Sequence, residues 1–274
     1  MCRLLNRLLW RFLGLVTALA AAPVLAADGW AQVAYEPMAL GWSASEVERT
    51  TAANMHAIVL RAERDGLLGC RRSCERLGRI FERLVPMARA QTARSARLPW
   101  SLTVVRSTDF EAMALPGGQV LISEAFVDVS GLNDEAIAFV LGHEMSHSIL
   151  EHERQTLHFA RMLLPRDVPR SVADMYAEID YSFTLLKSLE PVLQQGELEA
   201  DELGLLLASS AGFDPQRQLG FVAWEAERSD GATLVQTHPP AQQRLERLRL
   251  RLPLANRLYT TGQAAGHEPA EASK

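Results

Sequence analysis

The stretch NDEAIAFVLGHEMSHSILEH (residues 133–152) is typical of a single amphipathic helix, and the rest of the chain is best understood around it. Asn133 is a favourable N-cap, and Asp134 and Glu135 place negative charge in the first turn, where the helix dipole stabilises it. Apolar side chains recur at helical spacing and predict a core-facing stripe: Ile137, Val140, Leu141, Met145 and Ile149. His143 and His147 stand only about 40° apart around the axis and one turn apart along it, so both imidazoles can reach one metal ion.

Glu144 follows the first of these histidines. From that position its carboxylate can contact a metal-bound water without ligating the metal. His-Glu-x-x-His on a helix is the arrangement of zinc proteases, in which the glutamate is the general base. Two surface histidines on an ordinary helix are the alternative, because this short motif also arises by chance. A third ligand would decide between the two.

The segment GELEADELGLLLASSAG (residues 196–212) offers Glu197 and Asp201 one turn apart, at the start of a predicted helix. A hydrolytic zinc site takes three protein ligands and keeps one position open. One carboxylate can bind the ion while the other accepts the ring N–H of a ligating histidine and fixes its tautomer. The alternative is an acidic first turn that the helix dipole stabilises.

HEMSHSILEH (residues 143–152) followed by ELEADELG (residues 197–204) resembles the zinc metallopeptidase family of the CAAX prenyl endopeptidase and the bacterial membrane protease HtpX, a gluzincin group. The resemblance implies one zinc ion per chain, with three ligands: His143, His147 and Glu197. It also implies that Asp201 supports a ligand from behind and that His152 has a structural role.

Two further stretches extend the resemblance. THPPAQQRLERL (residues 237–248) is similar to the family's late His-Pro element with a following arginine, here His238 and Arg244. ALPGGQVLISEAFV (residues 114–127) is similar to its strand-turn-strand, whose edge strand can pair with an extended substrate. We therefore expect substrate to bind the backbone of one strand: Gln119, Val120, Leu121, Ile122 and Ser123. Backbone pairing depends on extended shape rather than on side chains, which favours unfolded or misassembled proteins as substrates.

The expected reaction is peptide hydrolysis. Zinc lowers the pKa of its bound water, Glu144 takes the proton, and the water attacks a carbonyl polarised by the metal. The oxyanion needs a second donor, for which the candidates are His238, Arg244, Tyr176 and Tyr181. His238 either approaches the zinc or caps the helix that follows it. The alternative function is a chaperone or assembly factor that binds clients in the zinc cleft with little proteolysis.

Around these motifs the sequence predicts a mainly helical α+β domain with a small sheet beside the zinc helix. A helix capped by Ser43 or Ser45 covers residues 45–66, and a second follows Cys70 until Pro86 interrupts it. Residues 100–107 and 110–123 predict three strands, the last two joined by a Pro-Gly-Gly turn. Residues 153–196 form either a cleft wall or lid, or ordinary packing helices.

The N-terminal 26 residues have the pattern of an export signal, with three arginines, the apolar run FLGLVTALAAA (residues 12–22) and a small-residue exit. An uncleaved anchor is the alternative, although the run is short and is followed by Pro23. The prediction is therefore a signal at 1–26, a peptidase domain at 27–258 and a polar flexible tail at 259–274. After cleavage no transmembrane segment would remain, and the compartment would be the bacterial periplasm.

The formal net charge of −5 and the lack of a basic stripe argue against a nucleic-acid partner. The expected partners are extended protein substrates and assembly factors of the cell envelope. Cys70 and Cys74 in CRRSC form either a disulfide, which an oxidising compartment would permit, or two thiols.

Overall fold

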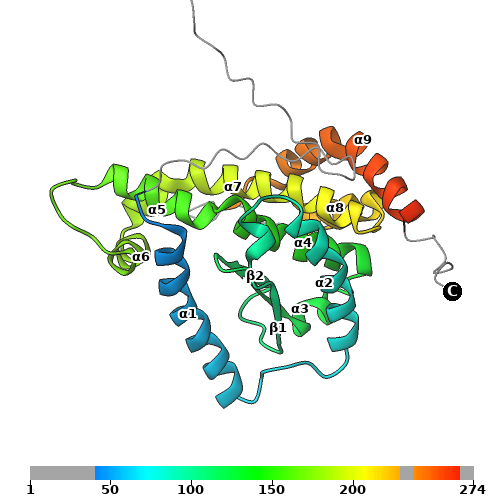
Figure 1. Ribbon diagram of the computed structural model, residues 1–274, viewed down its shortest axis with the longest axis horizontal. Coiled ribbons are helices and arrows are strands. Elements are labelled where there is room, and N and C mark those ends of the chain that lie inside the picture. Colours follow the sequence, from blue (N-terminus) through cyan, green and yellow to red (C-terminus); the bar gives the residue numbers. More distant parts are fainter. Residues whose placement is uncertain (1–40, 229–236, 266–274) are drawn as a thin grey trace, which may run out of the picture. The chain divides into compact units, whose positions relative to one another are not determined.

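Helices make up most of the described chain and surround one small sheet (Figure 1). The computed structural model describes residues 41–228 and 237–265, so the predicted export signal lies outside the described residues. The elements are α1 (Ala44–Arg64), α2 (Cys74–Arg89), η1 (Ser95–Arg97), β1 (Ser101–Val105), β2 (Ala112–Leu115), β3 (Gln119–Ser123), α3 (Glu124–Val129), α4 (Asp134–Leu150), α5 (His152–Leu163), α6 (Val172–Tyr181), α7 (Phe183–Ser210), α8 (Pro215–Arg228) and α9 (Ala241–Ala265). This confirms the α+β class and the sheet beside the His-Glu-x-x-His helix. No helix within the described ranges is both long and apolar enough to span a bilayer.

The helices α4 and α7 make the most extensive contact between elements and cross where two glycines meet. A Cβ added at Gly142 would lie 2.9 Å from the carbonyl oxygen of Gly204, and one added at Gly204 would lie 2.6 Å from the backbone nitrogen of His143. The missing side chains let the two backbones touch. This close crossing brings side chains of α4 and α7 within reach of one ion.

The sheet has the order β1-β3-β2, with β3 parallel to β1 and antiparallel to β2. Leu115 pairs with Gln119 across a three-residue loop that ends at Gly118, whose φ of 80° lies in the left-handed region. Such a loop is typical of a hairpin closed by a type I turn and a left-handed residue. The predicted Pro-Gly-Gly turn is confirmed.

The predicted substrate strand is wrong, because β3 is the central strand and both of its edges are used within the sheet. Pairing with β1 is a non-local contact, which the local sequence pattern does not reveal. The strand with an unpaired edge beside α4 is β2. Ser123 N–H donates to the Glu111 carbonyl, and in an antiparallel pair the hydrogen-bonded positions alternate. Met113 and Leu115 therefore bond toward β3, while Ala112 and Ala114 direct their backbone groups outward.

Two proline-containing helices are longer than predicted. In α2 the helix passes Pro86 and ends at Arg89, because Leu84 and Ala88 on either side of the proline are both buried. α7 begins at Phe183, where Ser182 accepts a hydrogen bond from Leu185 N–H at 3.2 Å, and it passes through Pro191. Glu197 and Asp201 thus lie in the middle of a 28-residue helix, not at its start. The alternative explanation, an acidic first turn stabilised by the helix dipole, therefore does not apply to Glu197 and Asp201.

Three further predictions concern the N-cap of α1, the two cysteines and the C-terminal tail. Ser43 is the N-cap of α1 and forms a capping box with Glu46, which settles the choice between Ser43 and Ser45. Cys70 and Cys74 are joined by a disulfide, with their Cα atoms 5.6 Å apart. α9 packs along α7 and continues to Ala265, so residues 259–265 of the predicted tail are helical and the domain passes residue 258. Residues 266–274 lie outside the described ranges.

Candidate metal centre

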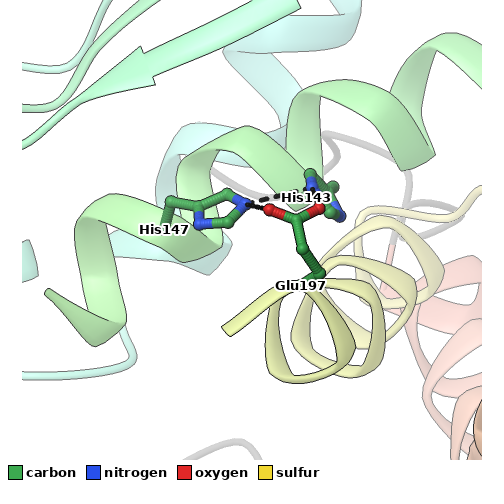
Figure 2. Close-up of side chains that lie close together, drawn as sticks. All are labelled: His143, His147 and Glu197. Carbon is green, nitrogen blue, oxygen red and sulfur yellow. Dashed lines mark hydrogen bonds and ion pairs between the residues drawn. The ribbon is translucent and has the colours of Figure 1, made fainter. Parts of the chain in front are cut away.

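His143 and His147 on α4 and Glu197 on α7 converge on one point, as Figure 2 shows. One ligand atom from each lies within 4.8 Å of the others. The two Nε2 atoms are 3.0 Å apart, and the Glu197 carboxylate lies 3.4 Å from His143 Nε2 and 3.5 Å from His147 Nε2. The structure therefore brings together all three of the ligands that the resemblance implied.

The chemistry of this cluster fits a zinc ion. Two imidazole nitrogens and one carboxylate form the ligand set of hydrolytic zinc sites, which leave a fourth position open. Glu197 Oε2 is buried and accepts no hydrogen bond from the described residues, although two histidine rings lie beside it. A buried oxygen of this kind is costly unless a cation or donor satisfies it.

Asp201 contacts Nδ1 of His143, the ring nitrogen that does not face the other two candidate ligands, as expected. Its Oδ1 lies 3.0 Å from His143 Nδ1, so the ring carries its proton there and leaves Nε2 free for a metal. Asp201 is fully buried and also receives two hydrogen bonds from Arg244, at 2.7 and 2.9 Å. These contacts hold the pKa of Asp201 below its ordinary value against the opposing effect of burial. The same carboxylate thus orients the ligand and anchors α9 to α7.

His147 is oriented by a second chain of contacts, which the sequence did not predict. His147 Nδ1 lies 3.0 Å from His152 Nδ1, and His152 Nε2 lies 3.2 Å from the Glu199 carboxylate. Because an ionised carboxylate only accepts, His152 carries its proton on Nε2 and accepts at Nδ1. His147 must then donate from Nδ1, which leaves its Nε2 unprotonated toward the site. Burial, together with His143 and His152, lowers the pKa of His147 well below its ordinary value, as a neutral ring requires.

Space for His152 comes from Gly196, where an added Cβ would lie 3.3 Å from the imidazole ring. Glu199 is itself held by Gln195 at 2.6 Å. The sequence signal for Glu199 was weak, since it lies two residues from Glu197 and so on the opposite side of the helix. It supports the site only because α5 places His152 beside α7.

Glu144 has the properties of a general base. It lines the cleft that also holds both histidine ligands. Burial raises the pKa of Glu144 to about 7, with the charge of Glu197 acting in the same direction, while His143 and a hydrogen bond from the Ala114 backbone oppose the shift. A pKa near the working pH is the best compromise for taking a proton and then returning it.

The cleft around the site is bounded mainly by five elements of the fold. β2 forms one wall through Ala112–Leu115, and α4 forms the floor. The start of α1 and the helices α5 and α7 complete it through side chains that include Val47, Arg154 and Leu193. Residues 153–196 are therefore packing helices that also form a cleft wall.

Of the four candidates for the second oxyanion donor, only His238 lines this cleft among the described residues. Its Nε2 lies 3.2 Å from Glu197 Oε2, and its side chain is 67% exposed. Arg244 is instead committed to Asp201 and Glu225. Tyr181 is the last residue of α6 and is exposed, and Tyr176 packs against the core of α5, α6 and α7.

Comparison with known proteins also indicates a metallopeptidase. The model of peptidase family M48 matches residues 71–252. The mitochondrial metalloendopeptidase OMA1 of Schizosaccharomyces pombe is 27% identical over 186 residues, which cover 65% of this chain and 53% of that protein. The beta-barrel assembly-enhancing protease of Yersinia pestis is 28% identical over 174 residues, which cover 58% of this chain and 36% of that protein. Human OMA1 is 28% identical over 180 residues, covering 58% and 34% respectively. The chain spans about half, or less, of the length of these relatives.

Proposed function

The chain belongs to peptidase family M48 and is a metalloprotease, and on this premise we propose that it uses zinc to cut unfolded or misassembled proteins of the bacterial cell envelope. The observation that carries the proposal is the convergence of His143, His147 and Glu197 beside a partly buried glutamate with a raised pKa. The relative from Yersinia pestis is named for β-barrel assembly. That name, the export signal expected at residues 1–26 and the Cys70–Cys74 disulfide support the envelope as the place of action.

When bound, zinc supplies a Lewis acid that polarises a peptide carbonyl and lowers the pKa of water. The chain's own residues supply the rest of the reaction. Glu144 accepts a proton from the attacking water and delivers it to the leaving amine. Asp201 keeps a proton on His143 Nδ1, and His152 keeps a proton on His147 Nδ1, so both Nε2 atoms remain available.

The substrate is proposed to bind as an added strand on β2. Ala112 and Ala114 direct their backbone groups away from β3 and line the cleft, and β2 is the edge strand beside α4. An extended chain that pairs with this edge would run past Glu144, since the Ala114 backbone hydrogen-bonds to its carboxylate. Pairing through the backbone selects substrates that are unfolded. If the enzyme cut a tightly folded protein as fast as the denatured form, this part of the proposal would fail.

His238 is proposed to act on the solvent side of the site, because it reaches Glu197 while remaining exposed. In that position it can stabilise the oxyanion or restrain the resting enzyme. His238→Ala should therefore change turnover without reducing zinc content. Unchanged turnover on every substrate tried would discard this role.

The decisive experiment compares zinc content and cleavage of denatured casein in the wild type, Glu144→Gln and Glu153→Gln. Glu153 is a matched control because it is a second partly buried carboxylate that lines the same cleft and has a raised pKa. We expect stoichiometric zinc in all three and loss of cleavage in Glu144→Gln alone. Cleavage that survives in Glu144→Gln would overturn the mechanism. Zinc binding and client binding without turnover in the wild type would favour the chaperone alternative.

A further inference from the structure

A second hollow lies at the end of α5 away from the metal centre. Among the described residues it is lined by Gly41, His158, Arg161, Met162 and Arg166, none of which carries a carboxylate. Within the described ranges, no ion pair joins its three basic side chains to an acidic group. Arg154 and Arg170 nearby are each paired with a glutamate. The hollow therefore holds two guanidinium groups that are not paired with any described carboxylate, on a chain whose net charge is −5.

The basic side chains share one face because of their spacing. His158, Arg161 and Met162 stand at positions i, i+3 and i+4 of α5, which places them side by side on the helix surface. Leu157 and Ala160 on the other side of the helix are fully buried in the core shared with α1, α6 and α7. The basic face is thus held in place by a packed helix.

Other contacts fix the remaining members of the cluster. The Arg161 guanidinium lies 5.2 Å from the centre of the Trp42 ring. Arg170 donates to the carbonyls of Pro165 and Val168, at 2.8 and 3.1 Å, and pairs with Glu178 on α6. These contacts hold the loop between α5 and α6 in one conformation, and Arg166, which belongs to this loop, lines the hollow.

Apolar side chains flank the cluster and face solvent. Met162 is 51% exposed, Leu163 55% and Val168 46%. Exposed apolar side chains beside uncompensated basic groups are typical of surfaces that lie at a membrane interface. There the basic groups meet anionic headgroups while the apolar groups enter the acyl boundary.

We propose that this surface docks on an anionic phospholipid membrane, and we call it the α5 basic face: His158, Arg161, Met162, Leu163, Arg166 and Val168. Lipid phosphates would occupy the hollow, and the three apolar side chains would insert beside them. Charge complementarity selects this occupant, because an acidic chain approaches an anionic bilayer only through a locally basic face.

Docking would also place the catalytic cleft near the lipid. Arg154 in the first turn of α5 lines the cleft, and Arg161 lies seven residues further along the same helix. At the rise of an α-helix this is a separation of about 10 Å. Unfolded segments that leave or fail to enter a bilayer would then meet the cleft directly.

The test places an environment-sensitive fluorophore at Val168→Cys in a Cys2→Ser background, which leaves one free thiol because Cys70 and Cys74 are disulfide-bonded. The label should respond to vesicles of phosphatidylcholine with phosphatidylglycerol but not to phosphatidylcholine alone, which gives the background from charge-independent binding. A label at Leu250→Cys is the matched control, because Leu250 is exposed on α9. We expect no response there.

The affinity for phosphatidylglycerol vesicles should fall about 30-fold in Arg161→Gln/Arg166→Gln, because each basic residue near an anionic surface contributes roughly fivefold. Arg249→Gln/Arg257→Gln on α9 removes the same charge from exposed positions and should retain affinity. Equal losses in both double variants, or no response of the Val168 label, would overturn the proposal. A response that grows with protein concentration without vesicles would assign the face to a second copy of the chain instead. Casein cleavage should be unchanged in both double variants, so the outcome is independent of the peptidase assignment.

Discussion

Replacing Gly204 with alanine should force α4 and α7 apart and weaken the metal centre. The new Cβ would lie 2.6 Å from the backbone nitrogen of His143, which is 0.8 Å short of the 3.4 Å at which ordinary contact begins. The clashing atoms are backbone and cannot rotate away. Overpacking of this kind lowers the free energy of unfolding by up to about 3 kcal/mol, whereas the higher helix propensity of alanine raises it by about 1 kcal/mol. The expected net loss of about 2 kcal/mol lowers the Tm by roughly 4–8 °C for a domain of this size.

The effect on zinc should be larger than the effect on stability. His143 and Glu197 come from the two helices that must separate, and zinc–ligand distances tolerate only about 0.2 Å of error. We expect zinc affinity, measured by competition with a chelator, to fall about 10–100-fold. Gly220→Ala is the control, because that glycine lies within α8 and an added Cβ meets nothing within 4 Å. It should raise the Tm by about 2–4 °C. If Gly204→Ala also raised the Tm and kept full zinc affinity, the crossing would not control the site.

Three further predictions concern the groups behind the ligands. Arg244→Met leaves the buried Asp201 carboxylate without its guanidinium partner, which should cost about 3–5 kcal/mol of unfolding free energy in a denaturant titration, and a loss below 1 kcal/mol would show that the pair is not structural. Glu199→Gln removes the charge that fixes the His152 tautomer and should weaken zinc about tenfold in the same chelator assay, whereas unchanged affinity would remove His152 from the site's support. Asp201 and Glu197 outweigh burial and raise the pKa of His143 from 6.5 to about 10, so the ring is protonated at neutral pH in the metal-free chain and zinc must displace that proton. Zinc affinity should therefore rise about tenfold per pH unit between about pH 7 and 9, and a flat profile would contradict this assignment.

The candidate metal-binding histidines were predictable because their geometry is local. His143 and His147 share a helix face by spacing alone, and the cap at Asn133 fixes where that helix begins. Glu197 required the resemblance to a known family. The sequence placed Glu197 at the start of a helix, whereas α7 begins at Phe183 after the N-cap Ser182 and passes through Pro191.

The substrate strand was mispredicted for a different physical reason. Short apolar runs on either side of a Pro-Gly-Gly turn predict strands at residues 112–115 and 119–123, but strand order depends on pairing with residues 101–105, which are not identified as the partner by the local pattern. The pattern of β3 did hold a clue. Val120, Leu121 and Ile122 are all fully buried, and three successive apolar residues indicate a strand covered on both faces rather than an exposed edge.

The balance of charges around His143, His147 and Glu197 indicates which kind of ion these residues would bind. Glu144, Glu197 and Asp201 bring three carboxylates together, whereas Arg244 supplies one fixed positive charge. The remaining negative charge acts on the groups that can hold protons: it helps to raise the pKa of His143 to about 10, and the charge of Glu197 adds to burial in raising that of Glu144 to about 7. A divalent cation coordinated by His143, His147 and Glu197 would supply two positive charges in place of those protons. Its binding would leave His143 neutral, as a ligand must be, and would favour ionised Glu144, as a base must be. The same set of charges therefore explains why the site selects a divalent metal and why the base becomes competent when that metal is bound.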